Sequence, residues 1–69
     1  MASFNEVGRV HINNSREVVI SEVVDENVVM GININSFVVT NKYTGFTKGV
    51  FVPVTSIKNF NKLVDKACR

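Results

Sequence analysis

The stretch VVMGININSFVVT, residues 28–40, decides which fold the sequence predicts. From Met30 to Asn35, large apolar residues alternate with small or polar ones, among them Asn33 and Asn35. A period of two is typical of a strand with one apolar face and one polar face. We therefore expect a long strand whose apolar row faces the core and whose asparagine row faces solvent. The run Phe37-Val38-Val39 is apolar on both sides, as expected where a strand meets a second chain.

Two shorter strands are expected on the N-terminal side of this stretch. Apolar and polar residues alternate over residues 7–12, and residues 17–24 contain two valine pairs that place apolar groups on both faces. A polar turn at residues 13–15 separates the two strands. The three polar residues at positions 25–27 form a tight hairpin connection into the long strand.

A fourth strand and one helix are expected on the C-terminal side. A turn over residues 41–45 leads into a strand over residues 46–54, in which Gly49 interrupts the alternation. Glycine inside a strand marks a bulge or a close backbone approach, and a bulge would turn Lys48 to the opposite face. Residues 57–67 carry apolar side chains at helical spacing, and the threonine and serine just before them can cap the helix.

This order predicts an α+β protein with one domain over residues 1–69: a curved, four-stranded antiparallel sheet followed by one C-terminal helix (β-β-β-β-α). A chain of this length buries only about 60% of the surface that its unfolded form exposes. The single cysteine cannot form an intramolecular disulfide, and one short helix covers such a sheet only in part. We therefore expect a homodimer with two-fold symmetry.

The charge is distributed unevenly along the chain. Residues 1–40 carry two arginines and five acidic residues, whereas residues 41–69 carry six basic residues and one acidic residue. A basic segment of this kind is expected in a protein that binds the phosphate backbone of a nucleic acid, because each neutralised phosphate releases counterions. Lys58, Lys62 and Lys66 share one helix face, which either belongs to such a surface or is simply solvated.

Aromatic and basic residues are interleaved between positions 37 and 51, a composition that suits single-stranded nucleic acid. The sequence predicts four phosphate contacts, two stacking side chains and two hydrogen-bonding amides. These are, in that order, Lys48, Lys42, Arg9 and Arg16; Phe37 and Tyr43; and Asn33 and Asn35. For Phe37, packing in the core or in a dimer remains an equal alternative to stacking. Solvated asparagines are the commoner outcome for the amides.

Two stretches resemble the single-stranded-DNA-binding domain of the transcriptional coactivator positive cofactor four and its bacterial and viral relatives. The first is KGVFV, residues 48–52, followed by Ile57, Phe60 and Val64 at helical spacing. The second is VVMGINI, residues 28–34, which is similar to the long central strand of that family. The resemblance covers most of the chain. It implies a homodimer that binds unpaired DNA across curved sheets, with little sequence preference and no catalysis.

The family pattern also implies roles for individual residues. The lysine before Gly49 is the strongest match, and Arg16 looks similar to a basic residue that opens the second strand in the family. The family's stacking aromatic falls at Ser36 or Phe37. A family arginine falls on Asn33, and a phenylalanine falls near Val24, and both departures imply a lower affinity.

Catalysis is not expected, because His11 and Cys68 lie at opposite ends of the chain and no carboxylate pair shares a helix face. No metal site, cofactor, small-molecule substrate or membrane contact is expected either. The setting we expect is the cytoplasm, with a nucleoid or a virus-infected cell as variants, and the process is transcription, replication or repair. RNA as the ligand, an adaptor that docks on a polymerase, and a ribbon that reads duplex DNA remain the alternatives.

Overall fold

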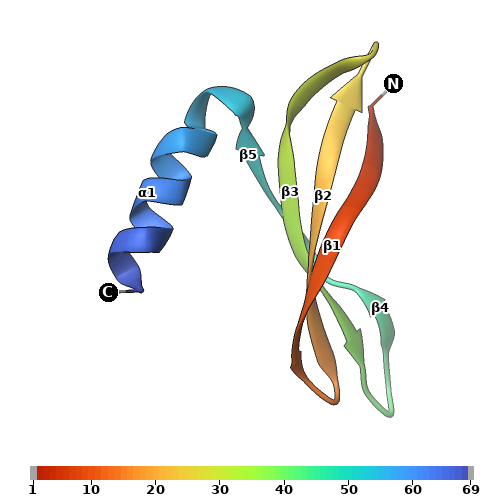
Figure 1. Cartoon of the computed structure of the whole chain (residues 1–69). Helices are drawn as coiled ribbons and strands as arrows, with labels where there is room; N and C mark the ends of the chain where they lie inside the picture. Colours follow the sequence, from red (N-terminus) through yellow and green to blue (C-terminus); the bar gives the residue numbers. More distant parts are fainter. Residues whose placement is uncertain (1, 69) are drawn as a thin grey trace.

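The computed structural model describes residues 2–68, which form five strands, a short 3-10 helix and one α-helix. The elements are β1 (Ser3–Asn13), β2 (Arg16–Asp25), β3 (Val28–Val39), β4 (Thr44–Phe46), β5 (Val50–Pro53), η1 (Val54–Ser56) and α1 (Ile57–Ala67). Their order confirms an α+β chain with an antiparallel sheet and one C-terminal helix (Figure 1). β1 begins earlier than expected, and the expected fourth strand is present as two pieces, β4 and β5.

The sheet has the order β1-β2-β3-β4, and β5 also pairs with β3. β4 and β5 share one edge of β3: β4 pairs with its C-terminal end, and β5 pairs with its N-terminal half (Figure 1). The ladders of the three long strands shift register by one residue at Val7, Ile12 and Met30. A bulge bends a strand and increases its twist, which accounts for the curved ribbons in Figure 1.

The hairpin predicted between the second and third strands is confirmed. Asp25 pairs with Val28, so the loop has two residues, Glu26 and Asn27, with φ values of 50° and 65°. Left-handed backbone at both positions is the conformation of a type I′ turn, whose twist matches that of the flanking strands. The turn thereby helps to set the register of the β2–β3 ladder.

The interruption predicted at Gly49 is also confirmed. Phe46 pairs with Phe37 and Val50 with Ile34, so two residues of β3 face three residues of the opposite segment, 47–49. The backbone N–H of residue 47 donates to Ser36 O at 2.8 Å, which keeps the bulged segment attached to β3. The extra residue separates β4 from β5 without removing either from the sheet edge.

Few apolar side chains are buried in the single chain. The buried apolar residues are Val19, Val23, Val38 and Val52. Val19 and Val23 pair with Asn35 and Gly31, and side chains of paired residues share a face, so half of the buried valines lie on the face of the asparagine row. The expectation that this row faces solvent is therefore wrong.

The reason for this difference lies at Gly31. A Cβ at this position would meet the carbonyl oxygen of Val52, and it would lie 2.9 Å from the Cα of Pro53. The end of β5 thus lies against the Gly31 side of β3 and covers it with backbone. Met30, which was expected in the core row, is the bulged residue and remains 44% exposed.

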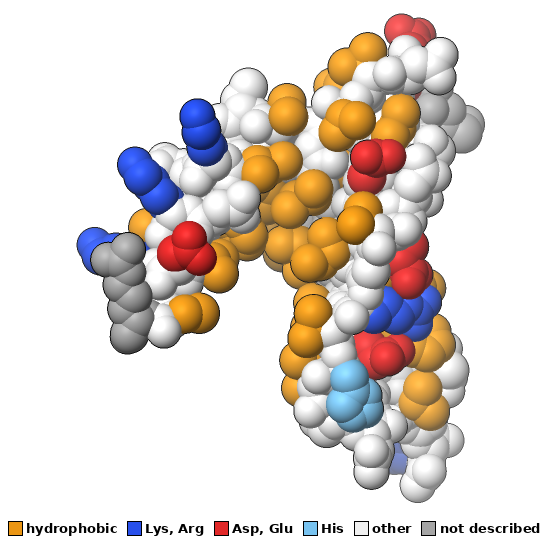
Figure 2. All heavy atoms as spheres, in the orientation of Figure 1, with side chains coloured by type: hydrophobic (Ala, Val, Ile, Leu, Met, Phe, Trp, Pro, Cys, Tyr) orange, Lys and Arg blue, Asp and Glu red, His pale blue; other side chains and the backbone are white. Residues whose placement is uncertain are grey.

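Helix α1 is present where the apolar spacing predicted it, but it does not lie flat on the sheet. It projects beside β3 from the end of β5, and hydrophobic side chains line the notch between helix and sheet (Figures 1 and 2). No α1 residue is buried, and Leu63 and Val64 are 62% and 45% exposed. Ser56 occupies the N-cap position without a side-chain capping bond, so the predicted cap is absent.

A helix that crosses a bilayer needs about 20 consecutive, mostly apolar residues. Within residues 2–68, no helix is long and apolar enough to cross a membrane.

Candidate nucleic-acid interface

The two faces of the sheet carry different predicted residues, because neighbouring side chains on a strand project to opposite faces. On β2, Arg16 pairs with Val38, and Glu17 pairs with Phe37. The guanidinium carbon of Arg9 lies 5.2 Å from the centre of the Phe37 ring, so Arg9 shares the face of Glu17 and Phe37. We call this surface the Arg9 face, and the surface that carries Arg16 and Val38 the Arg16 face.

Arg9 is held by two carboxylates and two aromatic rings. Its Nε and Nη2 atoms donate to the two carboxylate oxygens of Glu6 at 2.8 and 2.9 Å, and its Nη1 donates to Glu17 at 3.3 Å. The guanidinium also lies over Phe46, 5.7 Å from the ring centre, and the Phe37 and Phe46 rings meet edge to face at 5.1 Å. The structure thus brings together two of the predicted nucleic-acid contacts, Arg9 and Phe37. Both side chains already contact other residues of the protein.

The ion pairs have a clear electrostatic consequence. The hydrogen bond from Arg9, with its charge, lowers the pKa of Glu6, and the same hydrogen bond raises the pKa of Arg9. Two carboxylates around one guanidinium leave a net negative charge at this place. A phosphate that approached Arg9 would therefore meet Glu6 and Glu17 as well, and the Arg9 face is poorly suited to a polyanion.

The Glu6–Arg9 pair leads to a prediction about acid stability. The pKa of Glu6 is lowered below its ordinary value of 4.5, so the pair stabilises the fold above that pH and is lost as the pH falls through the lowered value. We expect Glu6→Gln to flatten the decline of Tm with falling pH, measured by circular dichroism in steps across the acid range. Glu26→Gln, in the β2–β3 turn, is the control and should leave the decline unchanged. Parallel declines for Glu6→Gln and the wild type would contradict the role of the pair.

Asn33 and Asn35 support the bulge between β4 and β5. The side-chain amide of Asn35 donates to the carbonyl oxygen of Thr47 at 3.4 Å. A Cβ on Gly49 would lie 2.6 Å from the side-chain oxygen of Asn33, so the Asn33 amide lies directly over this glycine. Both asparagines are half-buried. The Asn35 amide is therefore bonded to the protein's own backbone, and the Asn33 amide lies against it.

The Arg16 face carries a hollow of about 280 Å³ between the β1–β2 turn and the β3–β4 turn. Most of its lining residues have polar side chains, none of them is acidic, and much of the lining surface is apolar. The lining residues are Asn13, Ser15, Arg16, Val38, Thr40, Tyr43 and Thr47. Two predicted contacts, Arg16 and Tyr43, therefore lie at one place although they are far apart in the sequence.

Two exposed lysines are adjacent in sequence to residues that line this hollow. Lys42 precedes Tyr43 in the β3–β4 turn, and Lys48 follows Thr47 in the bulge, so each is one residue away from a lining residue. Both side chains are exposed. Of the eight predicted contacts, two therefore line the hollow, two adjoin lining residues in the sequence, and the remaining four lie on the Arg9 face.

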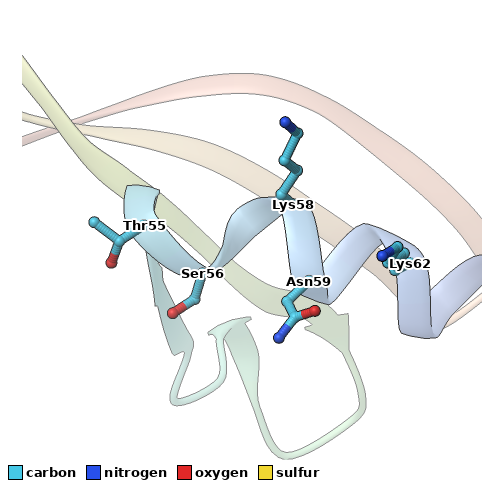
Figure 3. Close-up of a pocket in the computed structure, with 5 residues that line it drawn as sticks. All are labelled: Thr55, Ser56, Lys58, Asn59 and Lys62. Atoms are coloured by element: carbon cyan, nitrogen blue, oxygen red, sulfur yellow. The ribbon is translucent and has the colours of Figure 1, made fainter.

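A second hollow, of about 410 Å³, runs along the first turns of α1 (Figure 3). It is lined by Thr55, Ser56, Lys58, Asn59 and Lys62. Figure 3 shows the Lys58 side chain pointing away from Ser56 and Asn59, so the polar groups do not converge on one point. The helix lysines remain a solvated face or a weak accessory surface, as the sequence left open.

The sequence reasoning missed the partners of Arg9. Glu6 lies three residues before Arg9, and Glu17 faces His11 across the β1–β2 ladder. A prediction of the β1–β2 register would therefore have placed both carboxylates near Arg9. It also missed Asn13, Ser15 and Thr40. Turn residues of this kind carry no periodic signal, and only the meeting of two turns shows that they line a hollow.

Comparisons with protein-family models, with curated proteins and with solved structures gave no match to this chain. Among residues 2–68, no group of three or more histidine, cysteine or acidic residues could hold a metal ion. The candidate site is therefore defined by its own geometry.

Proposed function

We propose that the protein is a homodimeric single-stranded-DNA-binding protein that has little sequence preference and acts in transcription, replication or repair. The observation that carries this proposal is the hollow on the Arg16 face, which Arg16 and Tyr43 line without an acidic residue. The exposed Lys42 and Lys48 each adjoin one of its lining residues in the sequence. Cations that neutralise phosphates, together with an aromatic ring on which a base can stack, are the parts of a single-strand site. The resemblance to the positive cofactor four family supports the same function.

The small number of apolar side chains that are buried in the single chain supports the proposal of a dimer. Only four apolar residues are buried among the described ones, whereas Leu63, Val64 and the β5 residue Val50 are largely exposed. Removing such surface from water stabilises by roughly 25 cal/mol per Å², and a chain of this size has little other stabilisation. A dimer in which the apolar side of α1 packs against a second copy removes these side chains from water. Such a dimer would also carry two Arg16 faces.

Binding to oligo-dT tests the proposed function. Labelled oligo-dT should bind with an affinity that falls steeply between about 50 and 200 mM salt, because counterion release dominates the free energy. A duplex of equal length should bind more weakly, since its bases are not available for stacking. Fluorescence anisotropy at two salt concentrations measures both effects. Equal affinity for duplex and single strand, or no binding at low salt, would overturn the proposal.

Replacement of Lys48 tests the contact assigned to the bulge. Lys48→Ala should weaken the binding of different sequences alike and reduce the magnitude of the salt slope by about 0.7, the value for one phosphate contact on a single strand. Lys66→Ala, in the last turn of α1, removes the same charge far from the bulge and is the control. Equal losses in the two variants would show that affinity follows net charge alone, and would contradict a specific role for Lys48.

An adaptor that docks on a polymerase or another protein is the second candidate. It is favoured by β1, all of whose residues are exposed, including the large apolar side chains Phe4, Val7 and Val10. Within the described sheet β1 pairs only with β2, which leaves one edge for a partner strand. Amide spectra separate the two candidates, because an adaptor would show no change when oligonucleotide is added.

A further inference from the structure

We propose that the hollow on the Arg16 face is a pocket for one nucleotide unit, with the base against Tyr43 and the phosphate on Arg16. This inference rests on the proposed function and makes it more specific, since it assigns one discrete nucleotide subsite to each chain. Three features support it: the two turns that bound the hollow, the fixed position of the Tyr43 ring, and the Arg16 guanidinium, which has no carboxylate partner among residues 2–68.

The pocket is bounded by two turns that are joined by a backbone hydrogen bond. Val39 N–H donates to Ser15 O at 2.9 Å, which ties the end of β3 to the β1–β2 turn. Within the second turn, the Thr40 hydroxyl accepts from Tyr43 N–H and donates to Tyr43 O, both at 3.0 Å. Small-molecule pockets usually measure about 300–1,000 Å³, and the hollow, at about 280 Å³, lies just below that range, so one nucleotide unit is the largest ligand that we expect it to take.

The Tyr43 ring is held in place before any ligand arrives. Its hydroxyl donates to the carbonyl oxygen of Phe46 at 2.8 Å. The ring also lies against Gly45, where a Cβ would be 3.0 Å from the Tyr43 hydroxyl oxygen and where φ is 155°, a value that favours glycine. A side chain fixed in this way loses little conformational entropy on binding. Tyr43 nevertheless remains 52% exposed, which leaves ring surface for a base.

Arg16 differs from Arg9 in what its guanidinium contacts. Its Nη1 donates to the Ser36 hydroxyl at 3.3 Å, and among residues 2–68 no carboxylate lies within ion-pair distance of it. A guanidinium has five N–H donors in a planar fork that fits phosphate oxygens. Arg16 thus retains most of its donors, whereas Glu6 and Glu17 occupy those of Arg9.

The remaining lining also suits a nucleotide. The side-chain oxygen of Asn13 accepts from Ser15 N–H at 2.9 Å, and this bond leaves the amide N–H groups of Asn13 available to donate to a base or sugar oxygen. Because the lining contains no acidic residue, nothing in the pocket repels a phosphate. A nucleoside monophosphate unit of a nucleic-acid strand can contact all three groups, with its base on the Tyr43 ring, its phosphate on the Arg16 guanidinium and a base or sugar oxygen on the Asn13 amide.

The test is a titration of the chain of residues 1–69 followed by ¹H–¹⁵N spectra, with three probes: thymidine 5′-monophosphate, thymidine and inorganic phosphate. We expect saturable shifts of the Arg16, Tyr43 and Gly45 amides with the monophosphate. Thymidine and inorganic phosphate should each bind at least about tenfold more weakly, since each lacks one of the two contacts. Equal binding of inorganic phosphate would show a simple anion site and overturn the inference. Shifts confined to residues of the Arg9 face would also overturn it.

Two variants make the test specific. Arg16→Gln should abolish the advantage of the monophosphate over thymidine, and Tyr43→Ala should weaken oligo-dT binding by about tenfold, the effect of losing one stacked base. Lys66→Gln removes one charge at a distance and should leave the mononucleotide shifts unchanged. If oligo-dT binds and the monophosphate does not, the pocket is wrong and the proposed function stands. If neither binds, both are wrong.

Discussion

Replacing Gly31 with alanine should destabilise the protein by about 2 kcal/mol, within the range for overpacking a tightly packed position. The new Cβ would meet the carbonyl oxygen of Val52 and would lie 2.9 Å from the Cα of Pro53. Both atoms belong to backbone, so no side-chain rotation relieves the contact. β5 must move away from β3, and η1 and α1 must move with it because they follow β5 directly.

Thermal unfolding followed by circular dichroism measures this effect. In a domain of this size a loss of about 2 kcal/mol lowers Tm by roughly 8–16 °C. Gly8→Ala is the matched control, because a Cβ at Gly8 meets nothing within 4 Å and Gly8 also lies in a strand. We expect Gly8→Ala to leave Tm unchanged or slightly raised. Similar Tm values for the two variants would mean that β5 does not lie against Gly31.

Replacing Leu63 with glutamate should separate the proposed dimer into single chains. Leu63 is 62% exposed in the single chain, so a charge placed there would cost little if α1 had no partner. If α1 packs against a second copy, the same change buries an unpaired carboxylate at the interface, which costs several kcal/mol. The variant therefore distinguishes the two states by the size of its effect.

Analytical ultracentrifugation of the wild type and the variant measures this outcome. We expect a dimer for the wild type and a monomer with reduced Tm for Leu63→Glu. Lys62→Gln changes the charge by the same amount on the neighbouring, polar side of α1 and should remain dimeric. A monomeric wild type, or a Leu63→Glu variant as dimeric and as stable as Lys62→Gln, would contradict the proposed dimer.

The contrast between the two arginines on the sheet affects how a strand would bind. Arg9 lies with Glu6 and Glu17, and Arg16 lies with hydroxyl and amide groups. A polyanion is therefore repelled from one face and attracted to the other, so the two faces are electrostatically distinct. We infer that a strand on this protein follows the Arg16 face and passes Lys42 and Lys48.

Local periodicity in the sequence predicted most of the elements, although not the division of the fourth strand into β4 and β5. The alternation in β1 and β3, the polar residues of the β2–β3 turn and the helical spacing of α1 each depend on neighbours a few residues apart. The break at Gly49 was predictable for the same reason, since glycine weakens a strand wherever it occurs. These signals determine an antiparallel sheet followed by one helix.

The tertiary structure alone decided which side chains share a face and which are free. One-residue bulges at Val7, Ile12 and Met30 each reverse the alternation beyond them, and no periodic signal marks where they fall. Burial of the asparagine row depends on where β5 lies, and the Arg16 pocket depends on two turns that meet in space. Periodicity reports only contacts between near neighbours along the chain, whereas burial and pairing depend on residues that folding brings together from far apart.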